Sequence, residues 1–368
     1  MKVLLVVGSY PPSLCGVGDY TARLSERLNP IRVTLVASGR EGLSAPANRV
    51  RIRREMGGWR FGDLRRFLGI LDEERPDLVH FQYPSRDFGR KLLPVFLPLI
   101  LAVLRPRQVQ VCTIHEFAGI HPLRKIGYLF LTLFSRAVVT PSAEVRRGLS
   151  SFYPWVSGKS TVIPIGSFLP ERALPVRVPE GRPLLVFPGF LLPRKGPLEA
   201  LEAAALLKGR FPRLRLLFAS DGGSHGNERE RLRERARTLG LEDRVTFTGR
   251  LEPGQMTSVM RRADLVMLPF HDGASTRRST LASAATLRVP VVTTEGRHLL
   301  EEFRHGGVLL CKPRDPESLA EAVRLHLSDP AGRRRLRSRV AHLAALFDWR
   351  RIASAHRVLY EDVLGGGL

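Results

Sequence analysis

Short apolar runs alternate with amphipathic stretches along the whole chain. In the first half, the runs predict strands at 3–7, 33–37, 78–82, 109–114, 137–140 and 161–164. In the second half, they predict strands at 184–187, 214–219, 245–248, 265–268, 289–293 and 308–310. Because most of these runs are apolar throughout and do not alternate with polar residues, we expect strands that are covered on both faces, as in parallel sheets.

The intervals between the runs have helical periodicity. The predicted helices lie at 19–28, 61–73, 143–152, 197–208 and 227–239, and the tail from 316 to 364 is helical in pattern throughout. Such strand–helix alternation predicts an α/β fold with one doubly wound parallel sheet in each half. A stretch rich in Pro, Arg and Glu separates the halves. We expect a first domain at 1–170, a linker at 171–183 and a second domain at 184–347.

Length and charge narrow the class of protein. A chain of 368 residues is too long for one ordinary domain, which agrees with two similar halves. The net charge is +23, which reflects either a compositional bias towards arginine or attraction to polyanions. Phosphate-bearing substrates and an anionic membrane surface are the candidates. The arginines are scattered and not interleaved with aromatic residues, which argues against a nucleic-acid surface.

The longest apolar run, Leu92–Leu104, is shorter than the roughly 20 residues that span a bilayer. We expect a helix that is either buried or dipped into a membrane interface, with burial favoured. The first residues do not resemble a signal peptide, so we expect a cytoplasmic protein, with attachment to the inner face of the plasma membrane as an alternative. The three cysteines have no disulfide or zinc spacing, and no metal site is predicted.

Glycines and polar residues follow several predicted strands in the first half. Gly16 and Gly18 allow a sharp turn after the first strand, and Asp19 is placed to cap the next helix. The third glycine of a dinucleotide fingerprint is missing. His115 directly follows the strand at 109–114, where it is positioned to bond a sugar or phosphate, or to pack at the strand end.

The second half has cations in the corresponding loops. Arg194 and Lys195 precede a helix that begins near Pro197, and a cation beside a helix N-terminus suits a diphosphate. Glycine turns follow at 221–223 and 248–250. Arg277 and Arg278 stand between the strand at 265–268 and an Ala-rich helix, which predicts an anion-binding loop.

Taken in order, these segments resemble the retaining glycosyltransferases of the GT-B fold, in family 4. The resemblance covers nearly the whole chain, and its carriers are the segments at 11–21, 113–117, 140–142, 162–166, 188–196, 243–251, 263–270, 290–294 and 347–364. It implies two Rossmann-like domains facing across a cleft, an acceptor domain first and a nucleotide-sugar donor domain second. It also implies that a C-terminal helix, about 348–368, crosses back to the first domain.

The resemblance also implies roles for individual residues. His115, Lys195 and Asp272 would be catalytic. The donor diphosphate would be bound by Gly16, Arg194, Lys195, Arg277 and Arg278; the donor sugar by Asp272, Gly273, Ala274 and Ser275; and the nucleoside by Gly249, Arg250 and Ser283.

The chain departs from the family pattern in its donor loops. Phe190 replaces an arginine, and Ser275 and Ser283 occupy the places of two glutamates. Asp272 stands near the first of these places, and Arg277 with Arg278 can restore the charge lost at Phe190.

The resemblance implies sugar transfer from a nucleoside diphosphate sugar to an acceptor hydroxyl, with retention and without a metal or cofactor. The acceptor would be a glycan or a lipid-linked molecule of the cell envelope. Two alternatives stay open: a non-catalytic sugar-nucleotide binder or partner subunit, and a sugar-nucleotide epimerase. The loss of both glutamates counts against the epimerase.

Overall fold

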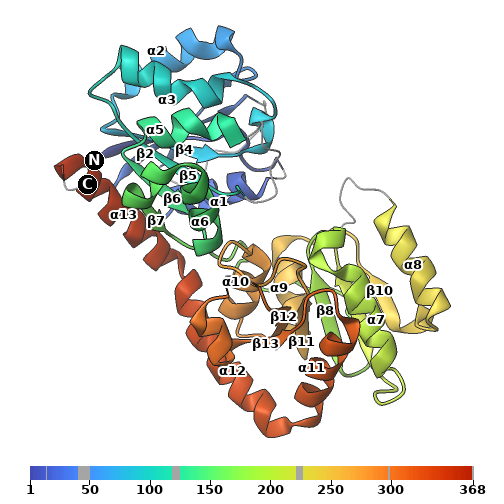
Figure 1. The fold of residues 1–368 in the computed structure, drawn as a ribbon. Helices are drawn as coiled ribbons and strands as arrows, with labels where there is room; N and C mark the ends of the chain where they lie inside the picture. Colours follow the sequence, from blue (N-terminus) through green and yellow to red (C-terminus); the bar gives the residue numbers. More distant parts are fainter. Residues whose placement is uncertain (14, 40–49, 118–124, 221–226, 297–298, 367–368) are drawn as a thin grey trace. The chain divides into compact units, whose positions relative to one another are not determined.

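The computed structural model describes residues 1–13, 15–39, 50–117, 125–220, 227–296 and 299–366 (Figure 1). Its internal contacts divide the chain into two compact units. The first comprises Met1–Ile165 together with Trp349–Leu368, and the second comprises Gly166–Asp348. Each unit contains one parallel sheet, so the predicted α/β class is confirmed.

The first unit contains a seven-stranded sheet in the order β3-β2-β1-β4-β5-β6-β7, and every pairing is parallel. Its strands are β1 (Lys2–Val6), β2 (Arg32–Ser38), β3 (Val50–Met56), β4 (Leu78–Tyr83), β5 (Val109–Ile114), β6 (Ala137–Thr140) and β7 (Ser160–Val162). Its helices are α1 (Gly16–Ser25), α2 (Leu64–Glu74), α3 (Leu93–Leu104), α5 (Leu129–Phe134), α6 (Ala143–Phe152) and α13 (Trp349–Gly365), with short helical turns at Phe61–Asp63, Arg86–Phe88, Ile126–Tyr128 and Pro154–Lys159.

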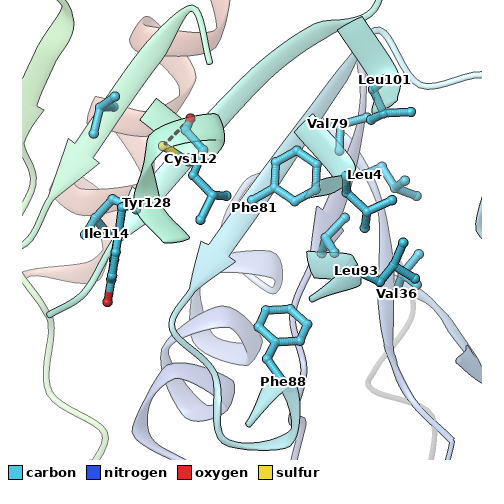
Figure 2. Packing of buried hydrophobic residues seen from close by; sticks show 14 of the residues in the cluster. Leu4, Val36, Val79, Phe81, Phe88, Leu93, Leu101, Cys112, Ile114 and Tyr128 are labelled. Carbon is cyan, nitrogen blue, oxygen red and sulfur yellow. Dashed lines mark hydrogen bonds between the residues drawn. The ribbon is translucent and has the colours of Figure 1, made fainter. Parts of the chain in front are cut away.

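Alternate residues of the central strands face opposite sides of this sheet. Leu4 and Phe81 join a hydrophobic cluster with Leu93 and Leu101 of α3 (Figure 2). Neighbouring strand residues such as Leu5 are equally buried but lie outside that cluster. The sheet is therefore covered on both faces, which explains why its strands are apolar throughout.

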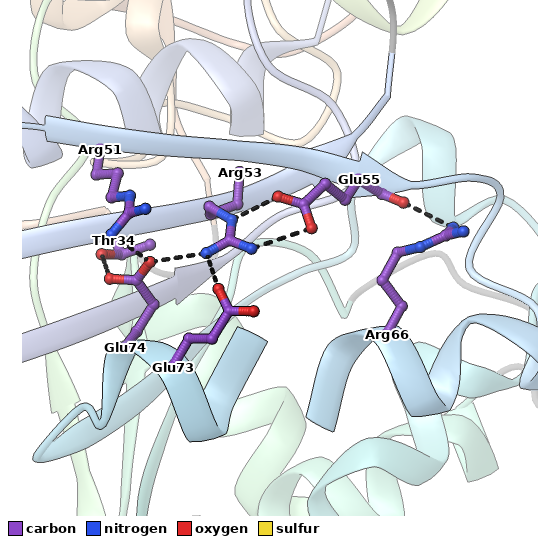
Figure 3. Close-up of polar contacts among 7 residues, drawn as sticks. All are labelled: Thr34, Arg51, Arg53, Glu55, Arg66, Glu73 and Glu74. Carbon is purple, nitrogen blue, oxygen red and sulfur yellow. Dashed lines mark hydrogen bonds and ion pairs between the residues drawn. The ribbon is translucent and has the colours of Figure 1, made fainter. Parts of the chain in front are cut away.

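The edge strand β3 was not predicted, because its sequence VRIRREM is rich in charge. The Arg53 guanidinium bonds Glu55 at 2.5 Å, Glu73 at 2.7 Å and Glu74 at 3.0 Å (Figure 3). Carboxylates from the following helix thus neutralise the side chain, and the charged strand pairs with β2 at the edge of the sheet.

Helix α1 differs from its prediction, whereas helix α3 agrees with it. Helix α1 begins at Gly16 with Cys15 at the N-cap, so Asp19 lies inside the first turn and the prediction that it caps the helix was wrong. The missing Cβ of Gly18 lets the helix approach the loop after strand β1, because a Cβ there would lie 2.5 Å from the Ser9 carbonyl oxygen. Helix α3 is mostly buried, as predicted. No helix in the described ranges is long and apolar enough to cross a membrane.

The second unit contains a six-stranded parallel sheet in the order β10-β9-β8-β11-β12-β13. Its strands are β8 (Leu184–Pro188), β9 (Arg215–Ala219), β10 (Val245–Phe247), β11 (Leu265–Leu268), β12 (Val291–Thr294) and β13 (Leu309–Cys311). Its helices are α7 (Pro197–Leu207), α8 (Glu228–Thr238), α9 (Pro253–Arg262), α10 (Ser279–Thr286), α11 (Pro316–Ser328) and α12 (Pro330–Ala344), with helical turns at Pro193–Lys195, Glu242–Arg244, Phe303–Gly307 and Ala345–Phe347.

The segment predicted as a linker packs against this second unit. The Thr257 hydroxyl of α9 donates to the Pro170 carbonyl at 2.8 Å, and the Leu174 amide donates to the Gly254 carbonyl at 3.0 Å. The strand order places the C-terminal ends of β8 and β11 side by side at the centre of the sheet, where the loops with Lys195 and Arg278 begin.

Candidate functional site

The loop that follows β8 ends in a short turn with Arg194 and Lys195, directly before α7. Gly196 at the start of this helix has φ +77°, and a Cβ there would lie 2.2 Å from the Pro269 carbonyl oxygen. Only glycine permits this close approach of the two backbones. The His271 amide also donates to the Arg194 carbonyl at 3.0 Å. The loops after β8 and β11 are therefore held together by their backbones.

The loop that follows β11 contains a carboxylate between two guanidinium groups. Asp272 pairs with Arg277 at 2.5 Å and with Arg278 through its other oxygen. The Arg278 guanidinium also lies 4.3 Å from the centre of the Phe270 ring. Both arginine side chains are mostly buried, at 13% and 10% exposure, whereas Asp272 is 40% exposed. The pairing holds the two guanidinium groups in one orientation.

Lys195 lies close to this arginine pair. Burial, followed by the positive charges of Arg278 and Arg194, lowers the pKa of Lys195 to about 8. Its ammonium sits 5.3 Å from the centre of the Phe190 ring, which replaces the arginine expected in the family pattern. Positive groups held close together favour the binding of an anion, because an anion offsets their mutual repulsion. The arrangement is thus a preformed cationic site.

The residues assigned to the donor sugar line the same loop. Gly273 has φ +86°, and a Cβ there would lie 2.4 Å from the Gly296 Cα, so the loop packs directly on the segment after β12. The Ala274 amide donates to the Thr294 carbonyl at 3.1 Å. Ser275 is 6% exposed, and its hydroxyl accepts from the Arg277 amide at 3.4 Å. These residues shape the loop, and their predicted contact with a sugar stays a prediction.

The residues assigned to the nucleoside lie apart in the fold. Ser283, which stands at the place of the second expected glutamate, is 4% exposed and accepts from the Ser167 hydroxyl at 3.0 Å. Its hydroxyl therefore holds the 166–169 segment to helix α10. Gly249 and the exposed Arg250 follow β10, next to β9 at the sheet edge. The glycine turn at 221–223 lies outside the described residues.

In the first unit, His115 follows β5 and is 7% exposed. Its Nε2 donates to the Gln82 side-chain oxygen at 2.9 Å, which leaves Nδ1 as the acceptor. Burial and the proximity of His356 lower the pKa of His115 to about 3, so the imidazole is neutral. Gly16 lies exposed in the first turn of α1, where a Cβ would meet no other atom.

Gln82 and His80 belong to a buried polar network that the sequence prediction missed. The Gln82 amide nitrogen donates to His80 Nε2 at 3.2 Å, which also accepts from the Thr113 hydroxyl at 2.7 Å. His80 Nδ1 then donates to the Tyr360 oxygen of α13 at 2.6 Å. A signal was present in strand β4, because His80 and Gln82 are two residues apart and therefore share one face of an otherwise buried strand.

The network continues onto α13 through a second histidine. The Tyr20 hydroxyl donates to His356 Nε2 at 3.2 Å, and His356 Nδ1 donates to the Ile352 carbonyl at 2.9 Å. The Tyr20 ring also meets the His115 ring edge-on, with centroids 4.9 Å apart. Helix α13 thus completes the surroundings of His115 from the far end of the chain.

The second unit contains one further missed pair. His271 Nε2 and the Glu199 carboxylate lie 2.7 Å apart and join the loop after β11 to α7. Among the described residues, no group of three or more His, Cys, Asp or Glu side chains is arranged to hold a metal ion.

Comparisons with known proteins agree with this architecture. The sequence profile of the family "Glycosyltransferase Family 4" matches residues 15–166, and that of "Glycosyl transferases group 1" matches residues 174–342. The chain belongs to this family of glycosyltransferases.

Individual relatives match over much of the chain. A D-inositol 3-phosphate glycosyltransferase of Acidothermus cellulolyticus is 31% identical over 306 residues, covering 78% of this chain and 67% of the relative. A glycogen synthase of Mycobacterium tuberculosis is 29% identical over 229 residues, covering 61% of this chain; the match spans 54% of the synthase. The crystal structure of Anabaena HepE in complex with UDP-glucose superposes with a TM-score of 0.74 at 16% identity, covering 98% of this chain and 100% of HepE.

Proposed function

We propose that this protein transfers a sugar from a nucleoside diphosphate sugar to an acceptor hydroxyl, with retention of configuration. The observation that carries the proposal is the cationic site formed by Lys195, Arg277 and Arg278 at the ends of β8 and β11. Family membership supports the reaction class, and the fold is shared with a protein that binds UDP-glucose.

The chemistry that this site favours is departure of the diphosphate. The bond from the anomeric carbon to the phosphate oxygen breaks, and the electron pair stays on the diphosphate. Preorganised positive groups stabilise that growing charge, a contribution that reaches about 3–4 kcal/mol for a single donor in other enzymes. Lys195 and the two arginines supply this charge, so the proposed reaction requires no metal and no cofactor.

In the proposed retaining path, the acceptor oxygen attacks from the side that the diphosphate leaves. The acceptor proton passes to a phosphate oxygen, and no protein nucleophile is used. His115 takes part as a neutral hydrogen-bonding group, because its lowered pKa keeps the imidazole uncharged. Asp272 orients sugar hydroxyls through the part of its carboxylate that is exposed, while its ion pairs hold the loop.

The proposed acceptor is a glycan or a lipid-linked molecule. Exposed apolar side chains around α3 and α5 support a lipid-linked acceptor at an anionic membrane surface; they are Leu92, Val103, Leu104, Ile126 and Leu133. Arg90 and Lys91 precede the same helix. Binding of the purified protein to vesicles with and without anionic lipid tests this part, and indifference to the vesicles would count against it.

The central experiment is transfer and donor hydrolysis by Lys195→Ala across a panel of UDP-, GDP- and ADP-sugars. We expect loss of turnover with every donor that the wild type accepts. Lys312→Ala is the matched control, because Lys312 is an exposed lysine of the same unit. Equal activity of the wild type and Lys195→Ala would refute the assignment of the diphosphate site.

A second candidate function is sugar-nucleotide binding without turnover. It is favoured by one observation: Ser275 and Ser283 stand where the family pattern has glutamates, and both are buried in contacts within the unit. Calorimetric titration with UDP-sugars distinguishes the two functions. Tight binding that Lys195→Ala weakens, with neither hydrolysis nor transfer, would favour the binder.

A further inference from the structure

A second cationic pocket lies in the second unit at the N-terminal ends of the strands, whereas the loops with Lys195 and Arg278 follow the C-terminal ends. It has a volume of about 230 Å³ and is lined by Asp264, Pro290, His326, Pro330, Arg333, Arg334 and Arg337. Asp264 and Pro290 directly precede β11 and β12, whereas Lys195 and Arg278 lie in loops after strand ends. The pocket is therefore separate from the proposed donor site.

Three arginines of α12 contribute to this pocket. Arg333 and Arg337 are one helical turn apart, and like charges at this spacing destabilise a helix. Within the described ranges, no carboxylate forms an ion pair with Arg333, Arg334 or Arg337. Their neighbour Arg335, in contrast, pairs with Asp329 at 3.1 Å. The helix thus carries an uncompensated cluster of positive charge on the side that faces the pocket.

The carboxylate in the pocket wall has partners outside the arginine cluster. Asp264 Oδ2 accepts from the Leu184 amide at 2.7 Å and pairs with Arg182 at 2.9 Å. It holds the start of β8 to the start of β11, and its charge is balanced by a guanidinium from outside the pocket. The three arginines of α12 therefore determine the sign of the field in the pocket.

His326, in the last turn of α11, supplies a second and independent observation. It lines the pocket and is only 5% exposed, and its Nε2 has no hydrogen-bond partner in the described part of the chain. A buried polar atom without a partner is uncommon in a folded protein, and a bound ion or water molecule is one explanation for it.

We propose that this pocket binds a compact doubly charged anion of the phosphate class, held by the guanidinium groups of Arg333, Arg334 and Arg337. Guanidinium groups suit phosphate because their forked donors match its oxygens. The volume is below the roughly 300–1,000 Å³ of pockets for drug-sized ligands, which favours a small anion. Free phosphate and the phosphate group of a small monoester share this chemistry.

Titration of His326 supports the proposal. Burial first, and then the charges of Arg333 and Arg337, lower its pKa to about 4, while Asp264 and Asp329 act in the opposite direction. A bound dianion offsets the charge of the arginines and so raises the pKa of His326. Occupancy of the pocket can therefore be followed at one resonance, the imidazole Cε1–H of His326.

The test is calorimetric titration with inorganic phosphate at constant ionic strength, made up with chloride. We expect saturable binding by the wild type, and loss of at least about tenfold in affinity in the double variant Arg333→Gln/Arg337→Gln, since hydrogen bonds to charged groups are worth a factor of ten or more each. Arg339→Gln is the matched control, because Arg339 is an exposed arginine of α12 outside the pocket lining. Glucose 1-phosphate in a second titration distinguishes a monoester from free phosphate.

Phosphate can also enter the proposed donor site, so Lys195→Ala is titrated in parallel. Retained binding in Lys195→Ala, together with loss in the double variant, supports the proposal. The reverse pattern, or no saturable binding by the wild type, overturns it. The His326 resonance provides a measurement that does not depend on a variant: its pKa rises with phosphate if the pocket is occupied, and an unchanged pKa contradicts the proposal.

Discussion

Acid should destabilise the first unit through its buried histidines. Burial lowers the pKa of His356 from 6.5 to about 4 and that of His115 to about 3, and it holds the pKa of His80 well below its usual value. All three are neutral in the folded unit, whereas they take up a proton in the unfolded chain as the pH falls through 6.5. The contribution of these neutral histidines to the free energy of unfolding is therefore present above the unfolded pKa of 6.5. It is lost as the pH falls from 6.5 to the folded pKa.

The magnitude follows from the width of that window. Each pH unit below the unfolded pKa lowers the free energy of unfolding by about 1.4 kcal/mol for every histidine that stays neutral in the folded state. Acidification to about pH 5 covers about 1.5 units, so His356 alone should cost the folded state about 2 kcal/mol. His115 adds a similar amount. The sum is a large fraction of the roughly 5–15 kcal/mol that stabilises a typical domain.

Tryptophan fluorescence measures this effect in the first unit alone, because Trp59, Trp155 and Trp349 all belong to it. Urea unfolding is followed at about pH 7 and about pH 5 in the wild type and in His356→Gln, whose amide does not titrate. The wild type should lose about 2 kcal/mol more than the variant. His305→Gln, an exposed histidine of the second unit, is the control. Equal losses in the wild type and His356→Gln would refute the reasoning.

Three further substitutions test other features. Asp272→Asn removes the carboxylate between the two arginines. We expect unchanged or tighter UDP binding by calorimetry and a lower kcat. Weaker UDP binding would show that the ion pairs are needed to build the site. Gly196→Ala places a Cβ against a backbone oxygen at φ +77° and should lower the free energy of unfolding, measured by thermal unfolding, by more than about 1–3 kcal/mol. Gly209→Ala, with open space around it, should be neutral or stabilising. Equal effects of the two substitutions would contradict the close approach. Arg53→Gln should cost about 1–3 kcal/mol because three carboxylates lose their shared guanidinium, although Glu74 keeps its ion pair with Arg51. The exposed Arg51→Gln should cost less than about 1 kcal/mol. Hydrogen exchange of β3 is the readout, and similar exchange in both variants would be evidence against a structural role for Arg53.

The strands with apolar sequences could be predicted because their burial on both faces leaves little choice of residue. The strands at Val109–Ile114, Ala137–Thr140 and Leu265–Leu268 have the predicted bounds. Strand β3 could not be found in this way, since its charges are compensated by Glu73 and Glu74, which lie about 20 residues further along the chain. Periodicity describes a residue's own environment and contains no information about a distant partner.

In the candidate site, too, the positions of single residues could be predicted, whereas their distant partners could not. Lys195 and Arg278 could be picked out by their place after predicted strands, and the adjacent order of β8 and β11 explains their proximity. The attachment of Asp272 to both arginines depends on the path of an irregular loop, which has no sequence period. Ser283 could be located but its partner Ser167 could not, because that contact joins segments more than a hundred residues apart.

The place of α13 in the chain has a consequence for biosynthesis. The residues before position 166 leave the ribosome before the second unit, but the helix that supplies partners for Tyr20 and His80 is made after it. The second unit, which is continuous in sequence, can complete its contacts while the first unit still lacks helix α13. The nascent first unit would therefore expose part of its polar network until α13 has been made, and a chain truncated before Trp349 would keep that surface uncovered for its whole lifetime.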